Sequence, residues 1–358
     1  MSTSSISRHL ARSLRPGYRL RSLLGSGGAA HVYVADELET GRRVAIKVLR
    51  EELAATISAR RFLHEINIAA QLEHPNIVPV SRSGTADGLP YYVMPFLEGE
   101  SLRTRLTRIG RLPLSEVLHI CEQVAAALEY AHRRRVIHRD IKPENVLLHE
   151  GRALVLDFGI ALALDAIEHR HTLPGSVIGT PEYMSPEQAQ GHEPIDGRSD
   201  VYSLACMAYE MISGHPPFSG APKLVFTRHI SAEPMPLCCS MPNVPHGLSA
   251  AVTRALAKTP DRRFATPGAF VAAMRAGCSA HESCRATPVG RTTEQRIAPM
   301  VERPSATKPS GHFALKMGLG AVVIALVVLS SSASEPSSPA SFAVSGRAAT
   351  ITIASGCV

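Results

Sequence analysis

His-Arg-Asp-Ile-Lys-Pro-Glu-Asn stands at residues 138–145, and Asp-Phe-Gly follows at residues 157–159. Two short apolar runs lie between them, and the Glu-Gly pair at residues 150–151 is typical of a turn. We therefore predict a β-hairpin that brings the two motifs together. Three side chains with oxygen atoms would then surround one small volume, those of Asp140, Asn145 and Asp157. Such oxygens suit hard, hydrated cations and can accept the proton of a hydroxyl group.

These two motifs resemble the signatures of the protein kinase family. The resemblance implies transfer of the γ-phosphoryl group of ATP, with Asp140 as base or orienting group for the substrate hydroxyl and Lys142 neutralising the transferred phosphoryl. It assigns Asn145 and Asp157 to Mg²⁺, with Mn²⁺ as an alternative cation. The implied fold is α+β and bilobal, with a small β-rich N-lobe that holds one helix and a larger, mainly helical C-lobe. We expect this domain over residues 18–276.

A glycine-rich turn precedes these motifs. Residues 18–25 read as a strand, and a second strand begins at His31. Glycine backbone between two strands can approach phosphates closely because it has no Cβ, although an ordinary hairpin would look the same. The resemblance supports the phosphate role, although Ala30 replaces the third glycine of the family. It implies a set of ATP-binding residues here: Gly25, Ser26, Gly27, Gly28, Ala29, Ala30, Val32, Ala45 and Lys47.

The predicted helix at residues 58–72 carries Glu65 on the same face as Phe62 and Ala69. The resemblance implies that Glu65 forms an ion pair with Lys47, the last residue of Val-Ala-Ile-Lys, and so positions it for catalysis. The alternative is a solvated glutamate on the helix surface.

A strand at residues 91–97 would connect the two lobes. In the family, adenine binds this segment through one carbonyl and, two residues later, one N–H. By position these are the carbonyl of Pro95 and the N–H of Leu97. Proline lacks an N–H but keeps its carbonyl, so it fits the first role. Met94 would guard the back of the pocket.

The 25 residues after Gly159 are polar and irregular, and they end in Gly-Thr-Pro-Glu-Tyr-Met-Ser-Pro-Glu at residues 179–187. This resembles an activation segment with its anchoring motif, with Ser185 in place of the family alanine. Lys142 and Thr180 together resemble serine/threonine kinases of the bacterial, eukaryotic-like branch. The resemblance implies a buried ion pair between Glu187 and Arg263.

Two further roles follow from the resemblance. Asp200 would cap its own helix and bind the backbone of the catalytic loop. Arg139 would bind a phosphate on the activation segment, at Thr172 or, as second choice, at Ser176. The enzyme would then phosphorylate its own segment, unless Thr172 is merely a solvated loop residue.

Composition limits the other functions. The 358 residues are 45% hydrophobic, enough for one large core or two modest ones. The net charge of +7 resides largely at the two ends, without a basic stripe interleaved with aromatic residues, so we expect solvated tails and no nucleic-acid partner. Seven cysteines without a Cys-x-x-Cys pair favour a reducing compartment for most of the chain.

The two ends differ from the centre. We expect residues 1–17 to be disordered and residues 277–312 to form a linker containing Pro, Ser and Arg. Residues 313–330 are apolar enough for one transmembrane helix, and a buried core helix is the alternative. Basic residues lie before this run, so the kinase domain would be cytoplasmic in a single-pass protein of the inner (plasma) membrane. Cys357, in the short outer tail at 331–358, could link two chains into a homodimer.

The sequence thus predicts a membrane-anchored, non-specific serine/threonine protein kinase of class EC 2.7.11.1 that acts on protein substrates in signalling. A pseudokinase scaffold is one alternative, but the full set of catalytic residues argues against it. A small-molecule phosphotransferase is another, but it should lack the peptide-docking segment at residues 179–187.

Overall fold

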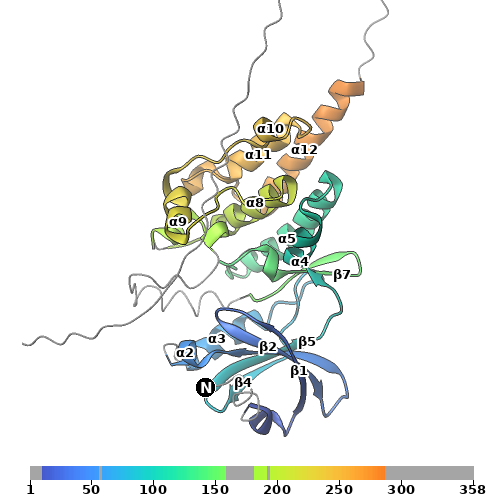
Figure 1. Ribbon diagram of the computed structural model, residues 1–358, viewed down its shortest axis with the longest axis vertical. Coiled ribbons are helices and arrows are strands. Elements are labelled where there is room, and N and C mark those ends of the chain that lie inside the picture. Colours follow the sequence, from blue (N-terminus) through green and yellow to red (C-terminus); the bar gives the residue numbers. More distant parts are fainter. Residues whose placement is uncertain (1–9, 56–58, 159–180, 192–193, 287–358) are drawn as a thin grey trace, which may run out of the picture. The chain divides into compact units, whose positions relative to one another are not determined.

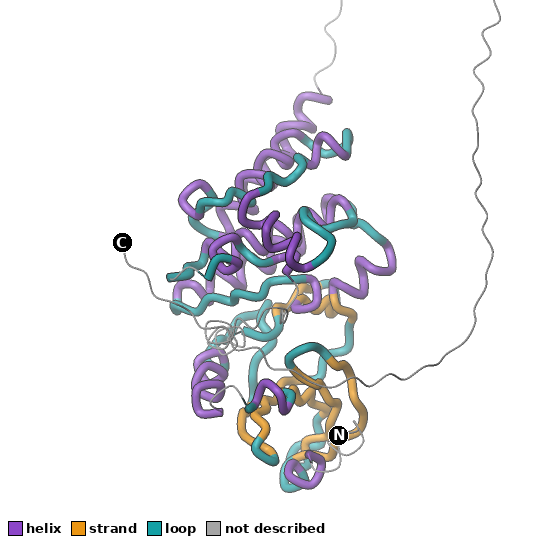
Figure 2. Tube along the Cα trace, turned by 60° about the vertical axis from the view of Figure 1, so that its left-hand side comes forward, coloured by secondary structure: helices purple, strands orange, loops and turns teal. Residues whose placement is uncertain are grey.

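The computed structural model describes residues 10–55, 59–158, 181–191 and 194–286 (Figure 1). A lobe of strands precedes a lobe of helices, and Figure 2 shows this division by secondary structure. The predicted bilobal α+β architecture is therefore present.

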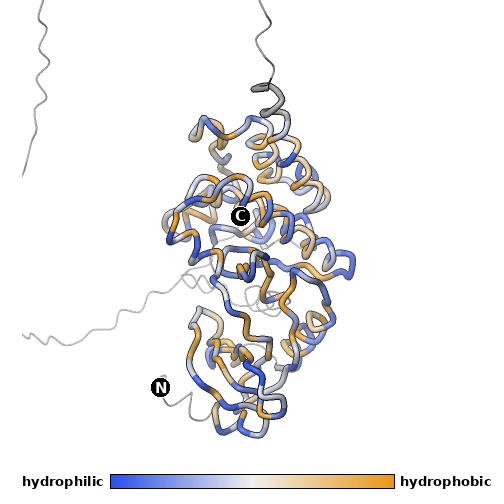
Figure 3. Tube along the Cα trace, turned by 90° about the vertical axis from the view of Figure 1, so that its right-hand side faces the viewer, coloured by the Kyte–Doolittle hydropathy of each residue, from blue (hydrophilic) through white to orange (hydrophobic). Residues whose placement is uncertain are grey.

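The N-lobe is built on a five-stranded antiparallel sheet in the order β1-β2-β3-β5-β4. Its strands are β1 (Tyr18–Ser26), β2 (Ala30–Glu37), β3 (Arg43–Leu49), β4 (Arg82–Ala86) and β5 (Leu89–Pro95). Figure 3 colours the chain by hydropathy. In β3 the side chains of Val44, Ala45, Ile46, Val48 and Leu49 are all buried, and successive side chains of a strand point to opposite faces. The sheet consequently has two apolar faces.

Helices cover both faces of this sheet, so the prediction that the N-lobe holds one helix is wrong. The helices α2 (Glu51–Ala54) and α3 (Ala59–Ala69) supply Leu53, Phe62 and Ile66 to a cluster with Leu49 of β3 and Tyr92 of β5. The opposite face, with Val44, Ile46 and Val48, packs against Leu10 and Leu14.

The prediction that residues 1–17 are disordered is wrong for residues 10–17. Residues 10–14 are helical and residues 15–17 form a turn that enters β1. Leu10 and Leu14 are four residues apart and therefore share one face of the helix, where they are 1% and 3% exposed. Their burial against the sheet outweighs the Ser- and Arg-rich composition that suggested disorder.

The C-lobe surrounds the helix α8 (Arg198–Ser213), in which every residue from Ser199 to Ile212 is buried. A helix that is buried all round lies in the centre of a domain. Around it lie α4 (Leu102–Ile109), α5 (Leu114–Arg133), α7 (Pro186–Ala189), α9 (Pro222–Ser231), α10 (Leu237–Ser240), α11 (His246–Ala255) and α12 (Pro267–Ala286).

Short elements surround the two motifs at residues 138–145 and 157–158 of this lobe. A second sheet has the order β6-β7-β8 and contains the predicted hairpin, with its turn at Glu150 and Gly151. Its strands are β6 (Glu100–Ser101), β7 (Val146–His149) and β8 (Arg152–Val155), and single 3₁₀ turns are η1 (Pro143–Asn145), η2 (Pro181–Tyr183) and η3 (Pro260–Arg262).

The linker does not begin at residue 277, as the sequence suggested. Helix α12 continues through Gly277 to Ala286, where the described ranges end. Gly277 instead lies at a close crossing of two helices: a Cβ on it would stand 2.3 Å from the carbonyl carbon of Gly247 in α11. The remaining linker, the apolar run at 313–330 and the tail lie outside the described residues. Within the described ranges, no helix has both the length and the apolar character to cross a membrane.

Candidate active site

The loop after α5 gathers the predicted catalytic residues of the C-lobe. The Nζ of Lys142 lies 2.8 Å from Oδ1 of Asp140. The Nδ2 of Asn145 donates to Oδ2 of Asp140 at 2.9 Å and to its main-chain oxygen at 2.8 Å. The side chain of Asp140 is 43% exposed, whereas that of Lys142 is 14% exposed. Asp140 is therefore held by two neighbours while its carboxylate remains open to a substrate.

Asp200 fixes the backbone of this loop from the first turn of α8. Its carboxylate accepts hydrogen bonds from the main-chain N–H groups of His138 (2.9 Å) and Arg139 (2.8 Å), and it pairs with Nε2 of His132 (2.7 Å). Burial alone would raise the pKa of Asp200, but these partners, His132 foremost, hold it below the ordinary value. The predicted contact with the loop backbone is confirmed. The predicted capping role is wrong, because the N-cap of α8 is Gly197.

Asp157 emerges from the hairpin and turns toward the N-lobe. Its backbone has a φ of 67°, which is uncommon for a residue with a side chain. One carboxylate oxygen lies 2.5 Å from Nζ of Lys47, and the other accepts a hydrogen bond from the hydroxyl of Tyr92 at 2.5 Å. Burial raises the pKa of Asp157, but the charge of Lys47 and the two hydrogen bonds more than offset it, so the pKa lies below the ordinary value. Asp157 is therefore a carboxylate at neutral pH.

The predicted ion pair between Lys47 and Glu65 is not formed in the described part of the chain, where the partner of Lys47 is Asp157. Glu65 lies half-buried on α3. The strand register explains the difference: Lys47 of β3 is directly opposite Tyr92 of β5, so both side chains extend from the same face of the sheet to Asp157.

The glycine turn between β1 and β2 is open. The N–H of Gly27 donates to the carbonyl of Ala30 at 2.9 Å, and the hydroxyl of Ser26 accepts from Arg50 at 2.9 Å. A Cβ built on Gly25 or Gly28 would meet no atom within 4 Å. Packing within the protein therefore does not require glycine there, which fits a backbone kept bare for a ligand.

Residues predicted to contact adenine lie where β5 leaves the sheet. Ala45 of β3 is paired with Met94 and is 4% exposed, and Val32 of β2 is paired with Lys47. Pro95 is the last residue of β5, and Leu97 follows in the connecting segment. The predicted ATP-binding side chains therefore belong to three adjacent strands, the glycine turn and this segment.

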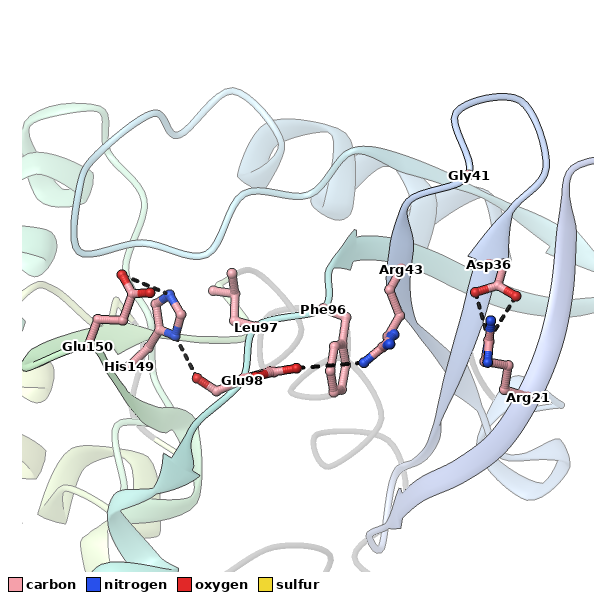
Figure 4. Close-up of a pocket in the computed structure, with 9 residues that line it drawn as sticks. All are labelled: Arg21, Asp36, Gly41, Arg43, Phe96, Leu97, Glu98, His149 and Glu150. Carbon is pink, nitrogen blue, oxygen red and sulfur yellow. Dashed lines mark hydrogen bonds and ion pairs between the residues drawn. The ribbon is translucent and has the colours of Figure 1, made fainter.

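A cavity of about 530 Å³ lies along the connecting segment (Figure 4). Its lining residues are Arg21, Asp36, Gly41, Arg43, Phe96, Leu97, Glu98, His149 and Glu150. The charged groups pair with one another: Arg21 with Asp36 at 2.7 Å, and Arg43 with Glu98 at 3.7 Å. Leu97 alone among the predicted site residues lines it. This cavity therefore does not coincide with the set of residues predicted to bind ATP.

The segment after the activation loop is tied to the catalytic loop. Ser185 caps α7 in a reciprocal pair with Gln188, whose Nε2 donates to the main-chain oxygen of Arg139 at 2.8 Å. The predicted ion pair is confirmed: two guanidinium nitrogens of Arg263 lie 2.7 Å from the two carboxylate oxygens of Glu187.

A second, partly buried network was not predicted. The guanidinium of Arg103 on α4 bonds to Glu144 of the catalytic loop at 2.7 Å and to Glu210 of α8 at 2.6 Å. The hydroxyl of Tyr183 in η2 joins both Arg103 and Glu210. No local pattern marks Arg103, His132 or Tyr92 in the sequence, since each acts on a residue far away in the chain. The Ser-x-x-Gln pattern marks Gln188 as part of a helix cap but does not reveal its bond to Arg139.

The residues present fit a divalent cation. Both N–H groups of the Asn145 side chain are directed to Asp140, so its oxygen remains to accept a cation, and Asp157 is ionised. Magnesium is commonly bound by one or two such oxygens together with substrate phosphates. No cluster of three or more His, Cys, Asp or Glu residues suited to a metal occurs in the described ranges, so an all-protein metal cage is not seen there. Thr172, Ser176 and Thr180 lie outside these ranges, and their roles stay predictions.

Comparisons with known proteins agree with this geometry. The model of the family described as "Protein kinase domain" matches residues 18–267. Serine/threonine-protein kinase PknB of Mycolicibacterium smegmatis is 42% identical over 256 residues, which cover 70% of this chain and 41% of that protein. The probable serine/threonine-protein kinase PknB of Bifidobacterium longum is 40% identical over 265 residues, or 71% of this chain and 38% of that protein.

A crystal structure of the kinase domain of Mycobacterium tuberculosis PknI, in a mutant form, has a TM-score of 0.60 and 32% sequence identity. The match covers 73% of this chain and 96% of that chain. The matched region thus spans about two-fifths of the curated relatives and nearly all of the solved domain.

Proposed function

Because this chain belongs to the protein kinase family and resembles its bacterial serine/threonine branch, we propose that it transfers the γ-phosphoryl group of ATP to Ser and Thr hydroxyls of proteins. The observation that carries the proposal is the group formed by Asp140, Lys142 and Asn145, on a loop whose backbone is held by Asp200. This group belongs to the same compact part of the chain as the ion pair between Lys47 and Asp157.

Each residue has a chemical task in this reaction. Asp140 orients the substrate hydroxyl and accepts its proton, and the adjacent ammonium of Lys142 balances charge on the transferred group. Asn145 and Asp157 would hold Mg²⁺, or Mn²⁺, which neutralises the phosphate charge when bound. Lys47 would contact the α- and β-phosphates. Lys47 bonds to Asp157 in this structure, so it must leave that carboxylate in order to bind phosphate. Glu65 of α3 would then be the acidic partner of Lys47.

Phosphorylation of a general protein substrate tests the proposal. The purified full chain with Mg-ATP should form phosphoserine or phosphothreonine, and Asp140→Asn should lower the rate at least about a hundredfold, the usual contribution of a positioned base. Asp261→Asn is a matched control, because that carboxylate is 82% exposed and pairs with Arg198 away from the site. ATP binding without transfer would indicate a pseudokinase scaffold. Phosphorylation of small molecules alone would indicate the small-molecule enzyme.

We further propose that the enzyme phosphorylates Thr172 of its own activation segment, with Ser176 as the second site. The backbone of Arg139 is fixed by Asp200 and Gln188, which supports a constant position for this arginine next to the catalytic loop. Mass spectrometry should find phosphate on the active full chain and none on the Asp157→Ala form. An unmodified but fully active chain would contradict this regulation.

Membrane anchoring belongs to the proposal as well. The support is the apolar run at residues 313–330, which has basic residues before it. In a single-pass protein of the inner membrane, this arrangement would place the kinase domain on the cytoplasmic side. The full chain should remain with membranes after carbonate extraction, and the double change Val323→Asp and Leu326→Asp should release it. Release of the unaltered chain by salt would contradict the anchor. A homodimer linked through Cys357 would appear as a reducible band of twice the mass.

A further inference from the structure

Tyr92 is a buried residue with an unusual contact. It belongs to β5, is 2% exposed, and shares a cluster with Leu49, Phe62 and Ile66. A tyrosine buried among apolar residues needs a partner for its hydroxyl. That partner is Asp157, at 2.5 Å.

Both oxygens of the Asp157 carboxylate therefore have a donor. Lys47 donates to Oδ2 and Tyr92 to Oδ1, each at 2.5 Å. The two donors come from opposite positions of adjacent strands, so they approach as a pair from the N-lobe. Asn145, the other residue expected to hold the cation, is directed to Asp140 and makes no hydrogen bond with Asp157 among the described residues. The two expected cation ligands thus have separate hydrogen-bond partners.

We propose that Tyr92 is a positioning residue that holds Asp157 on the N-lobe side until nucleotide and metal bind. This inference rests on the proposed nucleotide and metal site. A carboxylate oxygen that accepts a hydrogen bond has less negative charge to offer a cation, and here both oxygens of Asp157 have such a donor. Lys47 can leave Asp157 because the phosphates of the nucleotide offer it an equivalent anion. Tyr92 has no such alternative, so its hydrogen bond opposes binding of the metal.

The packing of Tyr92 prevents its hydroxyl from following Asp157. Its ring lies among side chains of α3, and only two dihedral angles separate the ring from the backbone. Phe62 and Ile66 flank Glu65 in sequence on the same helix. The position of the hydroxyl therefore depends on α3, and a shift of that helix would change how firmly Asp157 is held.

Calorimetric titration of the full chain with ADP tests the role. The dissociation constant for ADP is measured with Mg²⁺ and again with EDTA. The ratio is the constant in EDTA divided by the constant in Mg²⁺, and it reports how strongly metal and nucleotide bind together. Tyr92→Phe keeps the ring and removes the hydroxyl. We expect it to leave binding in EDTA within about twofold and to tighten Mg-ADP binding about tenfold, the order expected for one lost hydrogen bond to a charged group. A residue that merely supports the fold would alter both values alike.

Tyr91→Phe is the matched control, because Tyr91 is the preceding residue of β5 and packs on the opposite face of the sheet. Its ratio should equal that of the parent chain. An unchanged or smaller ratio in Tyr92→Phe would overturn the positioning role while leaving the proposed function intact. A parent chain whose ADP binding does not respond to Mg²⁺ would overturn both.

Discussion

Replacing Glu187 by glutamine should destabilise the C-lobe strongly. The side chain of Arg263 is 0% exposed and that of Glu187 is 12% exposed. All five N–H donors of the guanidinium have acceptors: two go to Glu187, and the others to the carbonyl groups of Ala257, Arg198 and Lys258 at 2.8–3.0 Å. Glutamine would present an amide group to one nitrogen and leave the buried cation without its counter-charge.

The size of the effect follows from this burial. Removing one partner of a buried pair costs about 3–5 kcal/mol, out of a total unfolding free energy of about 5–15 kcal/mol. For a domain of this size that corresponds to a fall in Tm of about 10 °C. Burial raises the pKa of Glu187, but the hydrogen bonds and charge of Arg263 lower it by more, so the net shift of the pKa is downward. The stabilisation is therefore present above the pKa of an unfolded glutamate, about 4.3, and is lost as the pH falls through the folded-state value.

Urea unfolding followed by circular dichroism would measure this difference at pH 7 and at successively lower pH. The deficit of Glu187→Gln should shrink as the parent chain takes up its own proton. Glu39→Gln is the control, because Glu39 forms an exposed pair with Arg82 and should cost less than about 1 kcal/mol. If the two variants lost equally little stability at pH 7, the argument from burial would be refuted.

Three other outcomes are expected. Lys47→Met should lower phosphoryl transfer by orders of magnitude while the circular dichroism spectrum still shows the folded chain; an unaltered rate in a filter-binding assay would remove Lys47 from the site. Leu14→Ala should cost about 2–5 kcal/mol in urea unfolding, since Leu14 is 3% exposed, and a cost near zero would mean that the N-terminal helix does not cover the sheet in solution. Burial, aided by the charge of Lys258, lowers the pKa of His229 to about 4. Between pH 6.5 and 4 the unfolded chain then binds more protons than the folded chain, so the free energy of unfolding should fall by up to about 3 kcal/mol as the pH falls. His229→Asn should flatten this dependence of stability on pH. Identical dependences in the parent and the variant would contradict the shift.

Much of the fold was predictable because its signals are local. The strand that carries Lys47, the helix α5 and the hairpin between the two catalytic motifs all follow from periodicity and turn residues within a few positions. The pair between Glu187 and Arg263 was predictable only through the family resemblance, since 76 residues separate them.

The failures share one cause, which is competition between partners distant in the chain. The sequence places Lys47 and Glu65 at suitable positions, but it does not reveal that Tyr92 and Asp157 will offer Lys47 a different arrangement. The composition of residues 10–17 suggests a solvated end of the chain, but Leu10 and Leu14 pack against the face of the sheet formed by Val44, Ile46 and Val48. Helix α12 likewise continues through Gly277 because Gly247 of α11 packs closely against it.

The burial of α8 has a consequence for how activity can be regulated. Asp200 near its first turn holds the catalytic loop, and Glu210 holds Arg103 and Tyr183. Ten residues of helix separate the two carboxylates by about 15 Å. Because one helix sets that separation, the catalytic loop held by Asp200 and the network of Arg103 and Tyr183 held by Glu210 keep a constant spacing. Activation would then act on parts that α8 does not hold, such as Asp157, whose contacts with Lys47 and Tyr92 can be exchanged.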